Sequence, residues 1–230
     1  MTALEKLQKQ IIDCEACPRL RDHCKSVAEV KRRAYLDWDY WGKPVPSFGD
    51  PKARVLLVGL APGAHGANRT GRMFTGDASG DFLFRVLHKT GFASQPDCTH
   101  RDDGLRLIDA YITASGHCAP PDNKPERDEL ARCRPYLERE LKLLKNVEVV
   151  VALGRIAFDT YIGILKDQGR LPKSSKLRFE HGLTHDLTPK LLCTYHPSQQ
   201  NTSTGRLTEQ MFTEIFLQAR SLLSVSQAGY

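Results

Sequence analysis

The sequence predicts an α/β fold with three layers, α/β/α, around a central four-stranded parallel sheet. Short apolar, β-branched runs alternate along the chain with longer segments in which apolar residues recur every three or four positions. This alternation is typical of parallel strands joined by crossover helices. The turns after these runs are rich in glycine, as in residues 59–66 and at Gly154, and open α/β sheets bind their ligands at such turns.

Four apolar runs have the composition of strands buried on both faces. They cover residues 54–60, 107–113, 147–153 and 191–195. Four segments have helical periodicity, at residues 81–90, 126–144, 156–165 and 207–223. Because ligands bind beyond the carboxyl ends of parallel strands, we expect the site in three loops, residues 60–81, 114–125 and 196–206.

The remaining segments carry weaker signals. Residues 38–51 contain glycine and three prolines, which suits an extended surface loop. Residues 19–33 are dense in Arg and Lys, which fits either a solvated helix face or phosphate contacts. Residues 224–230 are polar and are expected to fray. Because the chain has no internal repeat or low-complexity tract, we expect residues 1–230 to form one domain.

The composition is that of a globular chain without membrane spans. The 230 residues are 40% hydrophobic and 26% charged, with a mean hydropathy of −0.41, and no apolar run approaches the ~20 residues that cross a bilayer. The first residues have neither the apolar core nor the cleavage pattern of a signal peptide, so we expect a reducing cytoplasm. The net charge of +6 and pI near 8.9 weakly favour a polyanionic partner and decide nothing alone.

The seven cysteines, an odd number, are interpreted first as metal ligands in a reducing compartment. Cys14 and Cys17 form a CxxC pair, in which a tight turn aims both sulfurs at one ion or cluster. Cys118 and Cys133, with fourteen residues between them, best supply the other half, and nearby prolines stiffen the ligand loops. Spacing alone leaves an iron–sulfur cluster and zinc equally acceptable.

The alternative is that these cysteines are small buried hydrophobic residues. It fits poorly for Cys14 and Cys17, which stand in a charged segment flanked by proline. It fits well for Cys193, inside the last apolar run. Cys24 and Cys98 receive no role.

The loop after the first predicted strand, residues 59–81, holds six glycines. Glycines let backbone amides approach a ligand closely and form anion-binding concavities. The GxxxxGK[ST] motif of a Walker site and the GxGxxG motif of a dinucleotide site are missing from the sequence. The H-x-E and P-C-x-x-C motifs of a zinc deaminase are missing as well.

Several segments, taken in order, resemble the uracil-DNA glycosylase superfamily, specifically its iron–sulfur branches and most closely family 5. The resemblance covers nearly the whole chain. It rests on Cys14-x2-Cys17-Pro18, Gly59-Leu-Ala-Pro-Gly63, the glycine-rich residues 69–80, the CAPPDNKP segment at residues 118–125, Ala152-Leu-Gly-Arg155, and Tyr195-His-Pro-Ser198 with Asn201.

The resemblance implies a [4Fe–4S] cluster on Cys14, Cys17, Cys118 and Cys133, which breaks the tie with zinc. It also implies a DNA glycosylase that removes uracil and related deaminated bases. The implied partners are double- and single-stranded DNA containing such bases. The implied setting is a monomer in a prokaryotic cytoplasm, associated with the nucleoid.

A glycosylase must flip its base into a pocket with an aromatic face and hydrogen-bond donors. In related enzymes the phenylalanine at the position of Phe74 stacks on uracil, and the alternative is a core aromatic. Asn123 resembles the residue that reads the base edge, because a carboxamide offers a donor and an acceptor side by side. The alternative for Asn123 is a turn asparagine. Gly63 is expected to let the backbone approach the substrate.

His196 follows the last predicted strand, where a parallel sheet aims it at the ligand. A neutral His196 can donate a hydrogen bond to uracil O2, where negative charge develops as the base departs. The alternative is a structural histidine.

Cleavage also develops positive charge on the sugar, so a carboxylate beneath it is useful. Other branches place an acid or amide directly after the first strand, but here Gly59-Leu60-Ala61 has no polar side chain. Family 5 shares this departure and has an aspartate further on, which is Asp77 here. Asp77 is expected to stabilise the sugar cation or orient water, and its alternative is an N-cap without chemistry. Asp81 is expected to be the helix cap.

Residues 198–206 are expected to enter the duplex, with Asn201 at the rim of the pocket. Ser198 and its polar neighbours suit phosphate and sugar contacts better than sequence reading. Arg155, Arg206 and Lys124 would add positive charge for phosphates.

The expected activity is monofunctional hydrolysis, because no lysine stands in the motifs as a Schiff-base nucleophile. One rival is a non-catalytic iron–sulfur or zinc DNA-binding module, in which Asp77 and His196 are a cap and a core histidine. A second rival is a redox protein, which needs a reversible cluster potential. The sequence does not rank uracil, hypoxanthine, xanthine and hydroxymethyluracil.

Overall fold

The computed structural model describes residues 1–224, and its strands form one six-stranded sheet in the order β1-β3-β2-β4-β6-β5. The strands are β1 (Phe48–Gly49), β2 (Val55–Gly59), β3 (Ala110–Ala114), β4 (Val149–Leu153), β5 (Thr184–His185) and β6 (Lys190–Thr194). The four central strands pair in parallel, and the two short edge strands pair antiparallel to them. The predicted α/β fold with a central parallel sheet is confirmed.

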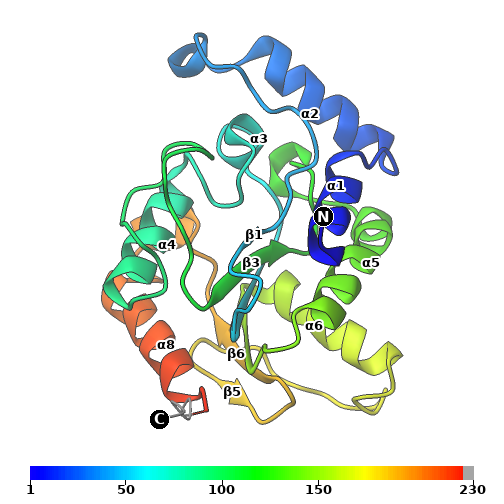
Figure 1. Ribbon diagram of the computed structural model, residues 1–230, viewed down its shortest axis with the longest axis vertical. Coiled ribbons are helices and arrows are strands. Elements are labelled where there is room, and N and C mark those ends of the chain that lie inside the picture. The colour runs from blue at the N-terminus through cyan, green and yellow to red at the C-terminus, as the bar shows by residue number, and fades with distance from the viewer. Residues whose placement is uncertain (225–230) are drawn as a thin grey trace.

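Helices cover both faces of the sheet (Figure 1). On one face lie α4 (Ala78–Lys89) and α8 (Glu209–Ser221), and on the other lie α1 (Ala3–Ile12), α5 (Arg127–Leu143) and α6 (Arg155–Asp167). The helix α2 (Pro18–Val30) and the short α3 (Ala67–Thr70) lie beyond one end of the sheet. The short elements α7 (Gln199–Ser203), η1 (Arg33–Tyr35) and η2 (Pro121–Asn123) complete the chain.

The central strands are apolar on both faces because each face has its own core. In β2, Val55 and Leu57 belong to the core beneath α4 and α8, whereas Leu56 and Val58 belong to the core beneath α5 and α6. All four side chains are fully buried. Two-sided burial of this kind holds the strand ends, and the loops that leave them, in fixed positions.

Several boundaries differ from the sequence prediction. The two edge strands were not predicted, and β1 lies within residues 38–51, which were expected to be irregular. The strand expected from residue 107 begins at Ala110, because Asp109 has a left-handed φ of 56° and its carboxylate accepts hydrogen bonds from Arg54. The basic segment 19–33 is helical up to Val30.

Asp81 was expected to be the cap of its helix, and this prediction is wrong. The helix α4 begins three residues earlier than Asp81, at Ala78, and its N-cap is Asp77. Asp81 lies inside the first turn, where its carboxylate contacts the Cys98 thiol at 3.6 Å.

Two further observations concern the chain as a whole. The fraying predicted for residues 224–230 falls, apart from Ser224, outside the described residues. None of the helices in residues 1–224 has the length and apolar character needed to cross a membrane.

Candidate active site and cysteine cavity

A cavity of about 670 Å³ opens at the carboxyl ends of β2, β3 and β6. All three loops predicted from the sequence contribute to its lining, with residues 60–66, 73–74 and 77–79 after β2, residues 120 and 122–124 after β3, and residues 196 and 198–200 after β6. The cavity therefore lies where an open α/β sheet is expected to bind its ligand. Among the predicted site residues, the lining includes Gly63, Phe74, Asp77, Asn123, Lys124, His196 and Ser198.

Asp77 has two separate environments for its two carboxylate oxygens. Its Oδ1 accepts hydrogen bonds from the backbone N–H groups of Ser79 and Gly80, both at 3.0 Å, and so caps α4. Its Oδ2 points toward the loop before it, where a Cβ added to Gly66 would lie 1.9 Å away and one added to Gly63 2.8 Å away. The cap role and a place in the cavity are thus combined in one side chain.

The environment of Asp77 also sets its protonation. Burial raises the pKa of its carboxyl, and the two backbone N–H groups oppose this rise because they favour the ionised form. The charge of Asp81 raises the pKa further, and the charge of Arg69 lowers it.

Phe74 forms one wall of the cavity in a conformation that few residues adopt. Its φ is 51°, in the left-handed region, where a bulky side chain is strained. Its ring lies so close to Gly59 that a Cβ there would come within 2.9 Å of it. Strain of this kind persists only where the surrounding structure holds it, which supports a functional position for the ring.

His196 lies beside Phe74, with ring centroids 5.8 Å apart and ring planes at 32°. Desolvation lowers the pKa of His196 to about 4, so the imidazole is neutral at pH 7. A neutral imidazole carries one N–H and can act as a hydrogen-bond donor without bringing a charge into the cavity.

Asn201 and Ser198 stabilise the backbone next to His196. The Asn201 side-chain amide donates to the backbone oxygen of His196 at 2.8 Å, and Asn201 is not among the residues that line the cavity. Ser198 lines the cavity and also caps α7, with its hydroxyl accepting from the backbone N–H of Asn201. Both residues hold the loop that carries His196.

Asn123 lies across the cavity on the loop that follows β3. It is exposed, and both Asp122 and Asn123 have left-handed φ values, 52° and 56°. Asparagine tolerates this region better than most residues. The same turn therefore presents Asn123 and Lys124 to the cavity.

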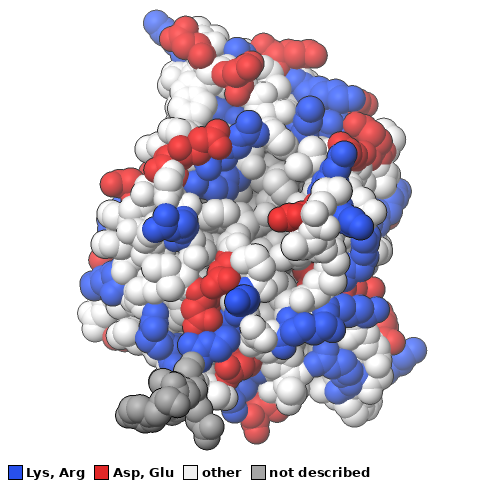
Figure 2. Space-filling view, in the orientation of Figure 1, with Lys and Arg blue, Asp and Glu red and all other residues white. Residues whose placement is uncertain are grey.

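The basic residues predicted to contact phosphates differ in their surroundings. Arg155 is exposed and pairs with Asp159 in the next turn of α6, whereas the Arg206 guanidinium lies over the ring of Tyr195, 4.5 Å from its centroid. On the face shown in Figure 2, Lys and Arg are spread among Asp and Glu and do not gather into one patch.

Two residues near the cavity were missed by sequence reasoning. His65 lines the cavity between Gly63 and Gly66, and its Nδ1 hydrogen-bonds the Tyr40 hydroxyl at 3.1 Å. The signal for His65 was its place in the glycine-rich loop. Nothing in the sequence pointed to Tyr40, because it stands 25 positions before His65 in the chain and only the fold brings the two side chains together.

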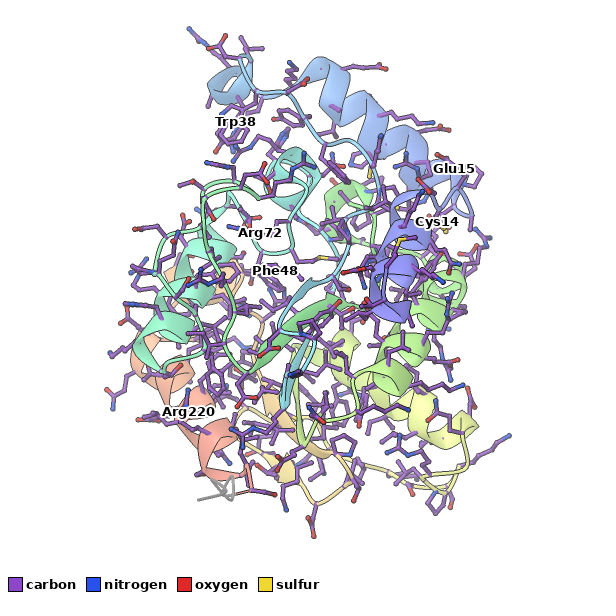
Figure 3. The ribbon with its side chains drawn as sticks, viewed as in Figure 1. Cys14, Glu15, Trp38, Phe48, Arg72 and Arg220 are labelled. Carbon is purple, nitrogen blue, oxygen red and sulfur yellow. The ribbon has the colours of Figure 1, made fainter. Side chains whose placement is uncertain are left out.

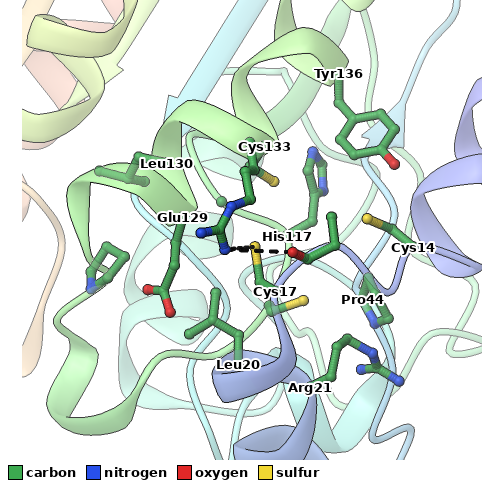
Figure 4. Close-up of a pocket in the computed structure, with 15 residues that line it drawn as sticks. Cys14, Cys17, Leu20, Arg21, Pro44, His117, Glu129, Leu130, Cys133 and Tyr136 are labelled. Atoms are coloured by element: carbon green, nitrogen blue, oxygen red, sulfur yellow. Dashed lines mark hydrogen bonds between the residues drawn. The ribbon is translucent and has the colours of Figure 1, made fainter.

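A second cavity, on the far side of the loop after β3, is lined by Cys14, Cys17, Cys118 and Cys133 (Figure 4). These four cysteines come from three separate parts of the chain: the link between α1 and α2, the loop after β3, and α5. All four are free thiols. The structure thus brings together the four residues that the sequence predicted as ligands.

Burial raises the pKa of the Cys17 thiol, and the nearby Arg132 opposes part of this rise. Arg132 approaches the Cys17 sulfur at 3.9 Å, and burial raises the pKa of the Cys133 thiol to about 12. Cys24 is fully buried in the small core beside Cys17 and Cys118 and does not line the cavity. Within residues 1–224, no group of three or more His, Cys, Asp or Glu side chains is arranged to hold a single metal ion.

Comparison with known proteins identifies the family of this chain. The profile of the family described as "Uracil DNA glycosylase superfamily" matches residues 46–220, which include every strand and the whole cavity lining. The chain belongs to this superfamily.

Relatives within the superfamily extend the match to nearly the full chain. A type-5 uracil-DNA glycosylase of Mycobacterium leprae is 47% identical over 97% of this chain and 97% of its own. One of Thermus thermophilus is 49% identical over 95% of this chain and 97% of its own, and one of Pyrobaculum aerophilum is 41% identical over 91% and 89%. The match to the superfamily model leaves out the CxxC pair at Cys14 and Cys17, whereas the match to these relatives spans nearly the whole chain.

Proposed function

We propose that this protein is a DNA repair glycosylase that hydrolyses the N-glycosidic bond of uracil in DNA and leaves an abasic site. The observation that carries the proposal is that a carboxylate, Asp77, and a neutral imidazole, His196, line one cavity beside an aromatic ring. The relatives named as type-5 uracil-DNA glycosylases support the same activity. A non-catalytic DNA-binding module would not require a carboxylate, a neutral imidazole and an aromatic ring in one cavity.

The chemistry assigns a separate task to each group. The bond between C1′ of the sugar and the base nitrogen breaks with its electron pair on the base, and the oxygen of a water molecule then bonds to C1′. Asp77, through the Oδ2 that its capping role leaves free, stabilises the positive sugar or orients that water. His196 donates a hydrogen bond to uracil O2 as negative charge develops there. The proton lost by the attacking water balances the charge on the departing base.

The remaining lining residues bind and orient the flipped base. Phe74 offers its ring face, and Asn123 offers the donor and acceptor of its amide to the base edge. Gly63 keeps the loop free of side-chain atoms beside Asp77. Removal of other deaminated bases, such as hypoxanthine and xanthine, belongs to the same proposal because their ring edges present similar carbonyl groups.

The DNA itself is expected to be double- or single-stranded, bound by a monomer in the cytoplasm at the nucleoid. Ser198 and Asn201 support the loop that would enter the duplex. Arg155, Arg206 and Lys124 would supply charge for phosphates, and such contacts carry no base information.

A [4Fe–4S] cluster on the four cavity cysteines is part of the proposal. The donor set fits, because four free thiols line one cavity and none is committed to a disulfide. A cluster binds each thiolate through a different iron, so its ligands need not meet at the single point that one metal ion requires. When bound, the cluster supplies a structural tie between the N-terminal segment, the loop after β3 and α5, so that residues 1–230 form one domain.

The decisive experiment measures release of free base from a duplex that contains one uracil. We expect release by the native protein, and a single-turnover rate lower by about 10²- to 10³-fold in Asp77→Asn and in His196→Ala, the scale of losing one preorganised electrostatic group. Binding to uracil DNA is expected to stay nearly intact in both variants. Binding without release of base by the native protein would instead favour the non-catalytic module.

A further inference from the structure

His65 is the one imidazole in the cavity lining that the proposed chemistry leaves without a task. It stands between Gly63 and Gly66, the two glycines that border the free oxygen of Asp77. Neighbouring residues contact both its backbone oxygen and its ring nitrogen Nδ1.

Both ends of His65 are held by neighbouring groups. The Arg69 side chain donates to the backbone oxygen of His65 at 2.7 Å, and the ring Nδ1 hydrogen-bonds the Tyr40 hydroxyl at 3.1 Å. The Arg69 guanidinium lies between the rings of Tyr35 and Trp38, at 3.8 and 4.0 Å from their centroids. Figure 3 shows Trp38 beside α3, at the end of the molecule that carries α2. Residues 31–43, the segment that follows α2, therefore hold His65 at two points.

The ring nitrogen Nδ1 of His65 is occupied by the Tyr40 hydroxyl. The Tyr40 oxygen also accepts from the backbone N–H of Arg32 at 3.5 Å. In the arrangement in which the hydroxyl donates to Nδ1, the ring proton of a neutral His65 lies on Nε2. No residue in the described part of the chain is hydrogen-bonded to Nε2. This N–H is therefore available to a ligand in the cavity.

The cationic side chains of Arg32 and Arg69 near His65 favour an anion as that ligand. Burial lowers the pKa of His65, and the positive charges of Arg32, Arg69 and His23 lower it further. The ring is therefore neutral at pH 7 and sits in a positive potential. A neutral donor in a positive field binds an anionic oxygen, and the anions that flank a flipped nucleotide are its phosphates.

We propose that His65, positioned by Tyr40 and aided by Arg32, binds a backbone phosphate next to the flipped nucleotide. The site rests on the proposed function, because it requires a nucleotide in the cavity. His65 is the contact and Tyr40 is a positioning residue. The contact holds the nucleotide in the cavity and leaves base recognition to the other walls.

The test replaces the phosphate and the histidine separately and together. Duplexes carry a non-cleavable uracil nucleotide, with an uncharged methylphosphonate at one flanking phosphate at a time. His65→Ala is expected to weaken binding of the unmodified duplex by about tenfold, the scale of a hydrogen bond to a charged group. At one flanking position, the methylphosphonate should weaken DNA binding by the native protein to a similar extent and leave DNA binding by His65→Ala unchanged.

Two further variants separate contact, positioning and folding. Tyr40→Phe keeps the ring but loses the hydroxyl that hydrogen-bonds Nδ1, so it should show a smaller loss of binding, and this loss should disappear at the same modified phosphate. His88→Gln, an exposed histidine near the end of α4, is the matched control and should bind like the native protein. Thermal unfolding of each variant shows whether a loss reflects the fold.

The outcomes distinguish this site from the proposed function. If His65→Ala and the methylphosphonate weaken DNA binding independently at every flanking position, so that their fold-losses multiply, the phosphate site is overturned. This holds even if the native protein releases uracil. Coupled losses in a protein that releases no base would support the phosphate site and overturn the proposed function.

Discussion

Placing a methyl group on Gly66 tests whether the position of the Asp77 carboxylate, and not merely its presence, matters for the reaction. The Cβ of Gly66→Ala would lie 1.9 Å from Asp77 Oδ2, whereas ordinary contacts begin at 3.4 Å. The carboxylate or the loop must therefore shift by about 1 to 2 Å, and a misplacement of about 1 Å can cost about 10² in rate. Gly63→Ala, with a contact of 2.8 Å, should displace Asp77 less and cost less.

The same shift should also affect α4. Asp77 Oδ1 caps the helix through two hydrogen bonds, and losing an N-cap costs about 1 kcal/mol of stability. Asp77→Asn retains a good capping side chain but loses the charge, so it should lower the rate with little change in the free energy of unfolding. Gly66→Ala should lower both.

The assay is single-turnover release of uracil at saturating enzyme, combined with urea unfolding of the same preparations. Asp81→Asn is the matched control, because Asp81 lies four residues further along α4 and does not line the cavity. A Gly66→Ala protein with the native rate would show that the placement of Asp77 beside this glycine has no part in the reaction.

Four further predictions follow from the same structure. The single-turnover rate should stay level as the pH falls through 6.5, because the pKa of His196 is about 4. The rate should drop only at lower pH, where Asp77, with its raised pKa, takes up a proton. A drop in rate centred at pH 6.5 would contradict this. The free energy of unfolding should decrease from about pH 6.5 to pH 4, since the unfolded chain protonates His196 and the folded chain does not. The purified protein should be brown and contain iron, and Cys14→Ala or Cys133→Ala should lose iron and stability together; a colourless protein with stoichiometric zinc would refute the cluster. Arg206→Ala should weaken binding to all DNA sequences alike and reduce the salt dependence by about one unit of slope, and an unchanged slope would remove Arg206 from the phosphate contacts.

The four central strands were predictable because both of their faces are buried, and this gives runs such as residues 55–59 without polar interruption. The helix α1 was not predicted, although Thr2 and Glu5 form a capping box, because its neighbourhood was interpreted mainly through the cysteines. The edge strands have two residues each, too few for any period to be visible. The four central strands were therefore found from their continuous apolar runs, whereas α1 was missed despite its local cap and the edge strands were missed because they depend on pairing with distant residues.

The residues of the candidate site were also predicted where a local motif marked them. Phe74, Asp77, Asn123 and His196 were predicted to share a site because each stands in a motif within a loop that follows a strand, and all four line the cavity. The distinction between Asp77 and Asp81 as the cap was missed, since both are acids near the start of one helix and the choice depends on the exact first residue, Ala78.

The carboxylate of the cavity does not come from the end of β2. The last residue of that strand, Gly59, is covered by the ring of Phe74, at 2.9 Å from an added Cβ, so Gly59 itself cannot carry a side chain, and the next two residues in the lining, Leu60 and Ala61, are apolar. The carboxylate instead comes from the N-cap of α4, and the space that it occupies exists because Gly63 and Gly66 carry no side chains. The left-handed backbone of Phe74, at φ 51°, turns the chain between these two features. The glycines, the strained phenylalanine and the capping aspartate are therefore one arrangement, and a methyl group at Gly59 should displace the Phe74 ring just as one at Gly66 should displace the Asp77 carboxylate.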